Sequence, residues 1–269
     1  MSSKQSHKVV VRNLFFVALF FYMPLQSMAW GMLGHRIIGE VASGYLTPEA
    51  SKEIKKILGT ETIAMASNWP DFIKSDTAYR YLNEWHYVDV EKGLNANQMQ
   101  GTLQADTAID AYTRLNFLVK QLKNKKLPQE KKLMYLRLLI HIVGDIHQPL
   151  HASANGSRGG NDIKVSWFGQ SSNLHRVWDE QLIDYQQLSY TEYTRAINFT
   201  TLAQRTAWQK QPLTSWIYES YSISNDLHDD IKPNEKLSYL YNFKHVKTLN
   251  QQLLKGGVRL AGLLNQVFG

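Results

Sequence analysis

Hydrophobic residues recur every three to four positions along most of this chain. That spacing matches one face of an α-helix and predicts a series of amphipathic helices. One helix is opened by Thr47 as its cap and Pro48 in its first turn, and Gly59 closes it. The other predicted helices span residues 106–123, 129–147, 174–185, 191–209, 212–228 and 244–266.

One segment departs from the helical period. Polar and apolar side chains alternate along residues 162–168, and the turn-forming residues 169–172 follow them. This pattern predicts a short β-hairpin or an extended loop. Residues 30–269 contain no repeat, low-complexity linker or composition break, so we expect one domain there. The predicted fold class is mainly α: a single-domain, multi-helix bundle with a short β-hairpin or extended loop.

The first 29 residues have the pattern of a signal peptide. Three basic residues precede an apolar run over residues 14–23, and residues 27–29 offer small side chains for cleavage before Trp30. An uncleaved membrane anchor is the alternative, but the run is too short to span a bilayer. We therefore expect an exported protein, periplasmic or secreted, without stable membrane association after processing. A monomer is expected.

Composition narrows the possible chemistry. The chain has 269 residues and no cysteine, which excludes thiolate zinc sites, cysteine nucleophiles and cysteine-held iron–sulfur clusters. An exported chain without disulfides must rely on its core or on bound metal for stability. Its net charge of +7 falls to +4 (27 − 23) without the first 29 residues, because that segment holds three basic and no acidic residues. This excess is compatible with a polyanionic substrate but does not establish one.

Two histidine–aspartate pairs carry the strongest chemical signal. His141 and Asp145 stand four apart in a predicted helix, and His175 and Asp179 repeat that spacing in another. Residues four apart project from the same helix face. Either pair alone is more often a salt bridge or a core histidine. Together, in a chain without cysteine, they favour a site for zinc, which binds histidine and carboxylate ligands.

A third histidine is expected near these pairs. Pro149 ends the 129–147 helix and turns the chain, so that His151 approaches the same region. His147 lies roughly 120° around the helix from His141. We therefore leave His147 out of the predicted ligands.

Three weaker motifs lie upstream. Trp69-Pro70-Asp71 and the stretch from Trp85 to Asp89 each place an acidic residue near an aromatic one, a pattern that usually marks a turn. At the expected mature terminus, a free amine on Trp30 would stand five residues before His35. An α-amine has an ordinary pKa near about 8, so a metal could displace its proton at modest cost.

These motifs together resemble the single-strand-specific zinc nuclease family represented by mung bean nuclease, over nearly all of residues 30–269. The motifs are Trp30-Gly-Met-Leu-Gly-His35, Trp69-Pro-Asp71, Trp85-His86-Tyr-Val-Asp89, His141-x3-Asp145-x5-His151, Gly159-Gly160-Asn161 and His175-x3-Asp179. The resemblance implies the helical fold shared by zinc phospholipase C and the zinc nucleases. The absence of cysteine departs from eukaryotic members and is typical of a bacterial one.

The resemblance also implies three zinc ions and their ligands. One zinc would take Asp71, His86, His141 and a bridging Asp145; a second would take His151, His175 and Asp179; a third would take the amine and carbonyl of Trp30 with His35 and Asp145. Asp71 would also orient the attacking water, and Lys74 would offset charge in the transition state. Lys74 as an ordinary solvated lysine is an equal alternative.

The same resemblance implies a base-binding pocket. Tyr87 would stack on a nucleobase, Asp89 would bond its edge, and Gly159 and Asn161 would complete the pocket. Because stacking needs an unpaired base, the implied substrates are single-stranded DNA and RNA, and nucleotides. The products would carry 5′-phosphates, with 3′-nucleotidase activity beside them. The family more often has Phe where Tyr87 stands, which leaves base preference open, and Tyr87 as a plain core aromatic is the alternative.

Two other functions compete with the nuclease. A zinc-dependent phospholipase C has a related site, but it has a longer gap between its first Trp and His and a Glu in place of Asp179. The stretch from His151 to His175 here is also longer and holds Gly-Gly-Asn. A zinc-stabilised exported binding protein without catalysis is the other possibility. The pairing of Asp71 with Lys74 argues against it, because a purely structural site needs no such pair.

Overall fold

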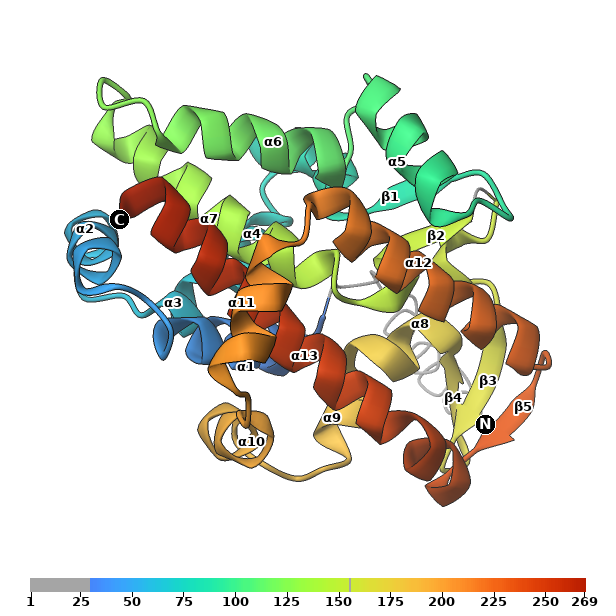
Figure 1. The fold of residues 1–269 in the computed structure, drawn as a ribbon. Coiled ribbons are helices and arrows are strands. Elements are labelled where there is room, and N and C mark those ends of the chain that lie inside the picture. The colour runs from blue at the N-terminus through green and yellow to red at the C-terminus, as the bar shows by residue number, and fades with distance from the viewer. Residues whose placement is uncertain (1–29, 155) are drawn as a thin grey trace, which may run out of the picture.

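The computed structural model describes residues 30–154 and 156–269. The predicted signal segment, residues 1–29, lies outside the described residues. The fold is mainly α, as predicted, with two small sheets on one side (Figure 1). No helix in the described ranges is both long enough and apolar enough to cross a membrane.

Helices account for most of the described chain. The α-helices are α1 (Met32–Ser43), α2 (Pro48–Leu58), α3 (Ile63–Ala66), α4 (Trp69–Ile73), α5 (Ala96–Ala105), α6 (Ala111–Leu122), α7 (Gln129–Asp145), α8 (Leu174–Arg176), α9 (Leu182–Asp184), α10 (Tyr190–Ile197), α11 (Leu202–Lys210), α12 (Leu213–Asp230) and α13 (Tyr239–Phe268). The tighter 3-10 helices are η1 (Thr77–His86), η2 (Pro149–His151) and η3 (Arg158–Gly160), and the wider π turn is η4 (Val177–Gln181). The strands are β1 (Val88–Val90), β2 (Ala152–Ala154), β3 (Lys164–Trp167), β4 (Gln170–Asn173) and β5 (Glu235–Leu237).

Several predicted helices are confirmed. Thr47 caps α2 by accepting the N–H of Ala50 at 3.2 Å, and Gly59 ends it with a φ of 69°. The predicted helices over 129–147, 174–185, 212–228 and 244–266 correspond to α7, to the run α8–η4–α9, to α12 and to α13. α13 begins at Tyr239, earlier than predicted.

The predicted helix over 106–123 starts too early. α6 begins at Ala111, because the Asp110 carboxylate accepts the N–H of Thr113 at 2.9 Å and acts as the cap. Ahead of it, the Asp106 carboxylate accepts the N–H of Ala108 at 2.7 Å in a turn. Aspartates that bond their own backbone compete with helix formation.

The prediction of a single helix over residues 191–209 is wrong. The chain breaks after Ile197 into α10 and α11. The Tyr45 hydroxyl donates to Asn198 at 2.5 Å and lies 3.1 Å from the Thr200 hydroxyl, and Thr201 then caps α11. A long-range contact thus overrides the local periodicity.

The core is built where α1, α7 and α13 pack on one another. α13 crosses the molecule in front of the other two (Figure 1). Ile37 and Val41 of α1, Leu139 of α7 and Leu253 of α13 are fully buried. The helices approach closely at Gly257, where an added Cβ would meet the Val41 Cβ at 2.4 Å. This packing fixes the face of α7 that carries His141 and Asp145.

The strands connect distant segments of the chain. β3 and β4 pair antiparallel as a hairpin, one of the two predicted alternatives, but residues 170–172, predicted to form the turn, lie in β4. β5 adds to β3 in parallel. β1 and β2 also pair in parallel, with Asp89 opposite Ser153. The sequence did not predict β1, β2 or β5, because segments of three residues carry too little periodicity. The β1–β2 pair brings the segment after His86 beside the segment after His151.

Candidate metal centre

The C-terminal half of α7 presents two polar side chains inside the core. His141 and Asp145 are both fully buried, and their facing atoms, Nε2 and Oδ2, lie 3.3 Å apart. The Nδ1–H of His141 donates to the Ser67 carbonyl at 2.6 Å. That bond fixes the ring and turns Nε2 toward Asp145. The four-residue spacing therefore acts as predicted, with both groups on one buried face.

Backbone carbonyls orient two further histidines in the same way. Nδ1 of His151 donates to the His86 carbonyl at 2.7 Å, and Nδ1 of His175 donates to the Gly159 carbonyl at 2.7 Å. Each ring is thereby held with Nε2 directed at the Asp179 carboxylate, at 3.8 and 3.0 Å. A backbone carbonyl on one ring nitrogen is the usual support for a histidine that binds metal through the other.

His175 and Asp179 meet across a widened helical turn. His175 lies on α8, and Asp179 lies inside the π turn η4. Such single π turns occur often at functional sites. Gln148, fully buried, donates its amide to the other Asp179 oxygen, Oδ1. The Asp179 carboxylate is therefore fixed from two sides.

His35 enters the cluster from α1 because a glycine leaves room for it. Its ring stacks on the His141 ring, with centroids 3.9 Å apart, and its Nε2 lies 3.4 Å from Asp145 Oδ1. A Cβ at Gly144 would meet His35 Nδ1 at 2.6 Å. Residue 144 must therefore be small for the His35 ring to fit.

Asp71, Lys74 and His86 complete the cluster. Asp71 lies in α4 and is buried, and the Lys74 ammonium lies 2.6 Å from its Oδ1. His86 ends η1, with its Nδ1 2.9 Å from Asp145 Oδ2 and 3.0 Å from His141 Nε2. The structure thus brings eight predicted ligand side chains into one buried region, from α1, α4, η1, α7, η2, α8 and η4.

The donor atoms fit divalent metal ions. Three groups each place their ligand atoms within 4.8 Å of one another: His35–Asp71–His141, His86–His141–Asp145 and His151–His175–Asp179. Among the described residues, Nε2 of His35 and of His151 has no hydrogen-bond partner although it is buried and directed at a carboxylate of the cluster. Buried polar atoms without partners are costly, and a metal ion in the group that contains His35 and in the group that contains His151 would satisfy them.

The charges point the same way. Burial lowers the pKa of His35 and of His141 to about 4, so both imidazoles are neutral and offer a lone pair. Burial alone would raise the pKa of Asp71, but His141 and Lys74 outweigh it and lower that pKa to about 2. Burial raises the pKa of Asp145 to about 8 without metal. Because metal ligands must be deprotonated, Asp145 needs a bound cation to stay ionised near neutral pH.

Trp30 lies beside the His175–Asp179 pair. Its side chain is fully buried, and the N–H of Gly31 donates to the Asp179 carbonyl at 2.7 Å.

His147 stays apart from the cluster, as expected. Its Nδ1–H donates to the Val143 carbonyl at 2.7 Å, and its Nε2 accepts from Arg259 at 3.0 Å.

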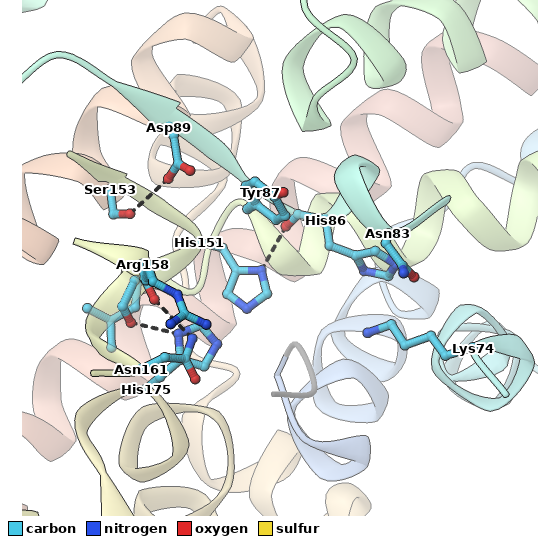
Figure 2. A pocket seen from close by; sticks show the side chains of 12 residues that line it. Lys74, Asn83, His86, Tyr87, Asp89, His151, Ser153, Arg158, Asn161 and His175 are labelled. Carbon is cyan, nitrogen blue, oxygen red and sulfur yellow. Dashed lines mark hydrogen bonds between the residues drawn. The ribbon is translucent and has the colours of Figure 1, made fainter. Parts of the chain in front are cut away.

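A cavity of about 460 Å³ opens onto the cluster. It is lined by Lys74, Asn83, His86, Tyr87, Asp89, Leu150, His151, Ser153, Arg158, Gly159, Asn161 and His175. Figure 2 shows Lys74 reaching in from the side opposite Asp89 and Arg158, with His151 between them. The four predicted base-pocket residues all line this cavity, and Tyr87 is 41% exposed rather than part of the core.

The sequence reasoning missed several residues of the site. Ser153 donates to Asp89 at 3.2 Å across the β1–β2 pair, and Arg158 and Asn83 line the cavity. Arg158 adjoins the Gly159-Gly160-Asn161 motif, which was a usable signal. Gly144 and Gln148 carried none, because their roles depend on the packing of α1 and on the position of η4.

Buried histidine and carboxylate donors beside an open cavity form the ligand set of hydrolytic metal enzymes. The family described as S1/P1 Nuclease matches residues 30–269, and the chain belongs to that family. It is a hydrolase of the nuclease class, from a family that is zinc-dependent in general.

Curated relatives cover nearly the whole chain. Endonuclease 3 of Arabidopsis thaliana is 28% identical over 265 residues, which cover 90% of each protein. Nuclease P1 of Penicillium citrinum is 27% identical over 89% of this chain and 98% of its own length. Nuclease S1 of Aspergillus oryzae is 27% identical over 90% of this chain and 92% of its own length.

Proposed function

We propose that this protein cleaves phosphodiester bonds of single-stranded DNA and RNA, leaving 5′-phosphates, and also removes phosphate from 3′-nucleotides. The observation that supports this proposal is the buried cluster of histidine nitrogens that have no hydrogen-bond partner within residues 30–154 and 156–269, beside a cavity lined by Lys74 and Tyr87. We further propose three zinc ions, in the ligand sets that the family resemblance implies. The third set differs from the grouping His35–Asp71–His141, but His35 lies 3.4 Å from Asp145 as that set requires.

Bound zinc would neutralise the phosphate and lower the pKa of a water toward neutrality. The chain's own groups orient the reactants. Asp71, whose pKa is lowered to about 2, stays ionised and accepts a hydrogen bond from the attacking water. Lys74 faces the cavity and sits 2.6 Å from Asp71, so its ammonium offsets charge that develops on the phosphoryl oxygens.

The cavity also accounts for a preference for single strands. The exposed ring of Tyr87 offers a stacking face, and Asp89 on β1 offers a carboxylate to the edge of the stacked base. A base inside a duplex presents neither a free face nor a free pairing edge. Stacking on aromatic side chains is tolerant of sequence, which suits a nuclease that acts on both DNA and RNA.

Cleavage can be tested directly. The zinc-loaded chain beginning at Trp30 would be incubated with single-stranded DNA, single-stranded RNA and phosphatidylcholine vesicles. We expect both nucleic acids to be cut. Lys74→Met should lower kcat at least about 100-fold, as expected for loss of one transition-state contact, while Lys56→Met on the exposed face of α2 should have no effect. Cleavage of the lipid alone would establish the phospholipase C alternative.

We also propose that export and activation are linked. Cleavage before Trp30 would free the amine that the third zinc needs. A protein with one extra residue before Trp30 should therefore bind one zinc fewer and lose most activity. Full activity with a blocked terminus would refute this role, and the mature N-terminal sequence together with the bound zinc per chain would test it independently.

A further inference from the structure

We propose that Arg158 is a base-recognition residue and that, with Asp89, it gives this nuclease a preference for guanine. The inference rests on the proposed function, because it concerns the nucleobase that enters the same cavity. Arg158 lines that cavity together with Asp89 and Tyr87. Figure 2 shows Arg158 on the side of Asp89, away from Lys74. The two cations of the cavity are therefore separated, with Lys74 at the cluster and Arg158 at the base pocket.

The backbone of Arg158 is held firmly against the metal centre. Its φ is 48°, in the left-handed region that few residues other than glycine adopt. The next residue, Gly159, gives its carbonyl to His175 and its N–H to the Ser157 hydroxyl at 3.2 Å. The Arg158 carbonyl accepts the amide of Asn161 at 3.0 Å. The left-handed turn thus fixes the backbone position from which the Arg158 side chain extends.

The guanidinium itself is free to take a ligand. Its contact in the structure is with Asp162, at 3.1 Å, and the two side chains are 71% and 61% exposed. Exposed ion pairs contribute little, so exchanging Asp162 for a substrate costs little. A guanidinium presents several N–H donors in a fixed plane, which suits two acceptors side by side.

Asp89 supplies the opposite chemistry in a fixed position. Its Oδ1 accepts the hydroxyl of Ser153, which stands directly opposite on β2 (Figure 2). An ionised carboxylate presents two acceptors to a base edge. The pocket therefore offers an acceptor pair from Asp89 and a donor pair from Arg158, with the Tyr87 ring as a stacking surface.

Guanine matches this arrangement best. It carries donors on its pairing edge, including the N2 amino group, and two adjacent acceptors, O6 and N7, which an arginine contacts in pairs. Adenine replaces the O6 acceptor by a donor amino group, so it opposes the guanidinium at one position. Uracil and thymine offer the Asp89 carboxylate a single donor, N3–H, which lies between two carbonyl oxygens that the carboxylate repels.

The test compares kcat/KM for the 3′-monophosphates of guanosine, adenosine, cytidine and uridine, using the zinc-loaded chain. We expect guanosine 3′-phosphate to be preferred over the uridine compound by about tenfold, the scale of one good paired contact to a base. Arg158→Gln should remove about that factor for guanosine and change the cytidine value less than about twofold. Arg195→Gln, the loss of an exposed arginine on α10, is the matched control and should leave all four values unchanged.

Arg158→Lys keeps the charge but loses the planar donor pair, and should behave like Arg158→Gln. Retained guanine preference in the lysine variant, or an equal loss on all four substrates, would overturn the proposal. Mapping cut sites on a mixed single-stranded oligonucleotide gives the same readout if the monophosphates are poor substrates. A wild-type protein that cuts no nucleic acid refutes the proposed function. A wild-type protein that cuts without a base profile sensitive to residue 158 refutes only the role of Arg158.

Discussion

Two buried histidines near the end of α7 have opposite environments. His141 and His147 are both fully buried, and each donates Nδ1–H to a backbone carbonyl. They differ at the second nitrogen. His147 accepts there from Arg259, whereas His141 faces Asp145 and His86 at 3.3 and 3.0 Å. Burial and ring orientation are thus common to both, and only the group on Nε2 separates a structural histidine from a candidate ligand.

The two surroundings also differ in what completes them. The Arg259 guanidinium also donates through Nη2 to Glu219 at 2.8 Å and to Gln211 at 2.6 Å, so protein groups supply partners for His147 Nε2 and for both terminal nitrogens of Arg259. Burial, and then the neighbouring Arg259 guanidinium, lower the pKa of His147 to about 3, which keeps it a neutral acceptor. In the cluster, the partners of several nitrogens are absent from the described protein atoms. We propose that metal ions supply them, which would make the cluster dependent on a ligand, whereas His147 Nε2 finds its partner in the protein.

Metal removal should have the largest effect. The chain has no cysteine and therefore no disulfide, so we expect metal binding to contribute directly to folding. A strong chelator should abolish activity and lower the melting temperature by about 10 °C or more, equivalent to several kcal/mol for a domain of this size. Calorimetry with and without the chelator measures this, and readdition of zinc should restore both values. A melting temperature unchanged by the chelator would show that the cluster depends on a ligand no more than the hydrogen-bonded group of His147, Arg259 and Glu219 does.

The same substitution at the two histidines should separate activity from stability. His141→Gln should lower activity at least about 1,000-fold and reduce bound zinc, since it removes a predicted ligand. His147→Gln should keep zinc content and kcat/KM, but lower the free energy of unfolding by about 2–3 kcal/mol because Arg259 loses a buried partner. Zinc analysis, kinetics and thermal melts on both variants decide the matter. Lost zinc in the His147 variant would contradict the comparison.

The sequence anticipates this distinction at the level of spacing. Four-residue pairs such as His141–Asp145 place both groups on one face, and the six-residue offset of His147 excludes it. The helical class follows from periodicity in the same way. What periodicity does not contain is long-range contact: the Tyr45 hydroxyl splits the helix predicted over 191–209, and the short β1–β2 pairing sets Ser153 against Asp89.

Gly144→Ala should damage the cluster from within the core. The new Cβ would meet His35 Nδ1 at 2.6 Å, so the His35 ring must move away from Asp145. We expect about 10- to 100-fold lower activity and weaker binding of one zinc, as for a disturbed ligand support. Gly101→Ala in α5, where a Cβ meets no atom within 4 Å, is the control and should stabilise the protein by about 0.5–1 kcal/mol. Unchanged zinc content in Gly144→Ala would remove His35 from the ligand set.

Two buried glutamines give the finest test. The Gln148 amide donates to the Asp179 carboxylate in the cluster, whereas the Gln252 amide donates to the His147 carbonyl and to Ser220, each at 3.1 Å. Both Gln→Ala changes remove buried hydrogen bonds and should cost about 1–3 kcal/mol of stability. Only Gln148→Ala should also weaken zinc, by about tenfold, because it frees the oxygen of Asp179 that the amide holds. Competition with a chromogenic chelator measures that difference. Equal zinc affinity in the two variants would mean that Asp179 is positioned by His175 and η4 alone. The Gln148 amide would then have no more effect on zinc than the Gln252 amide beside His147.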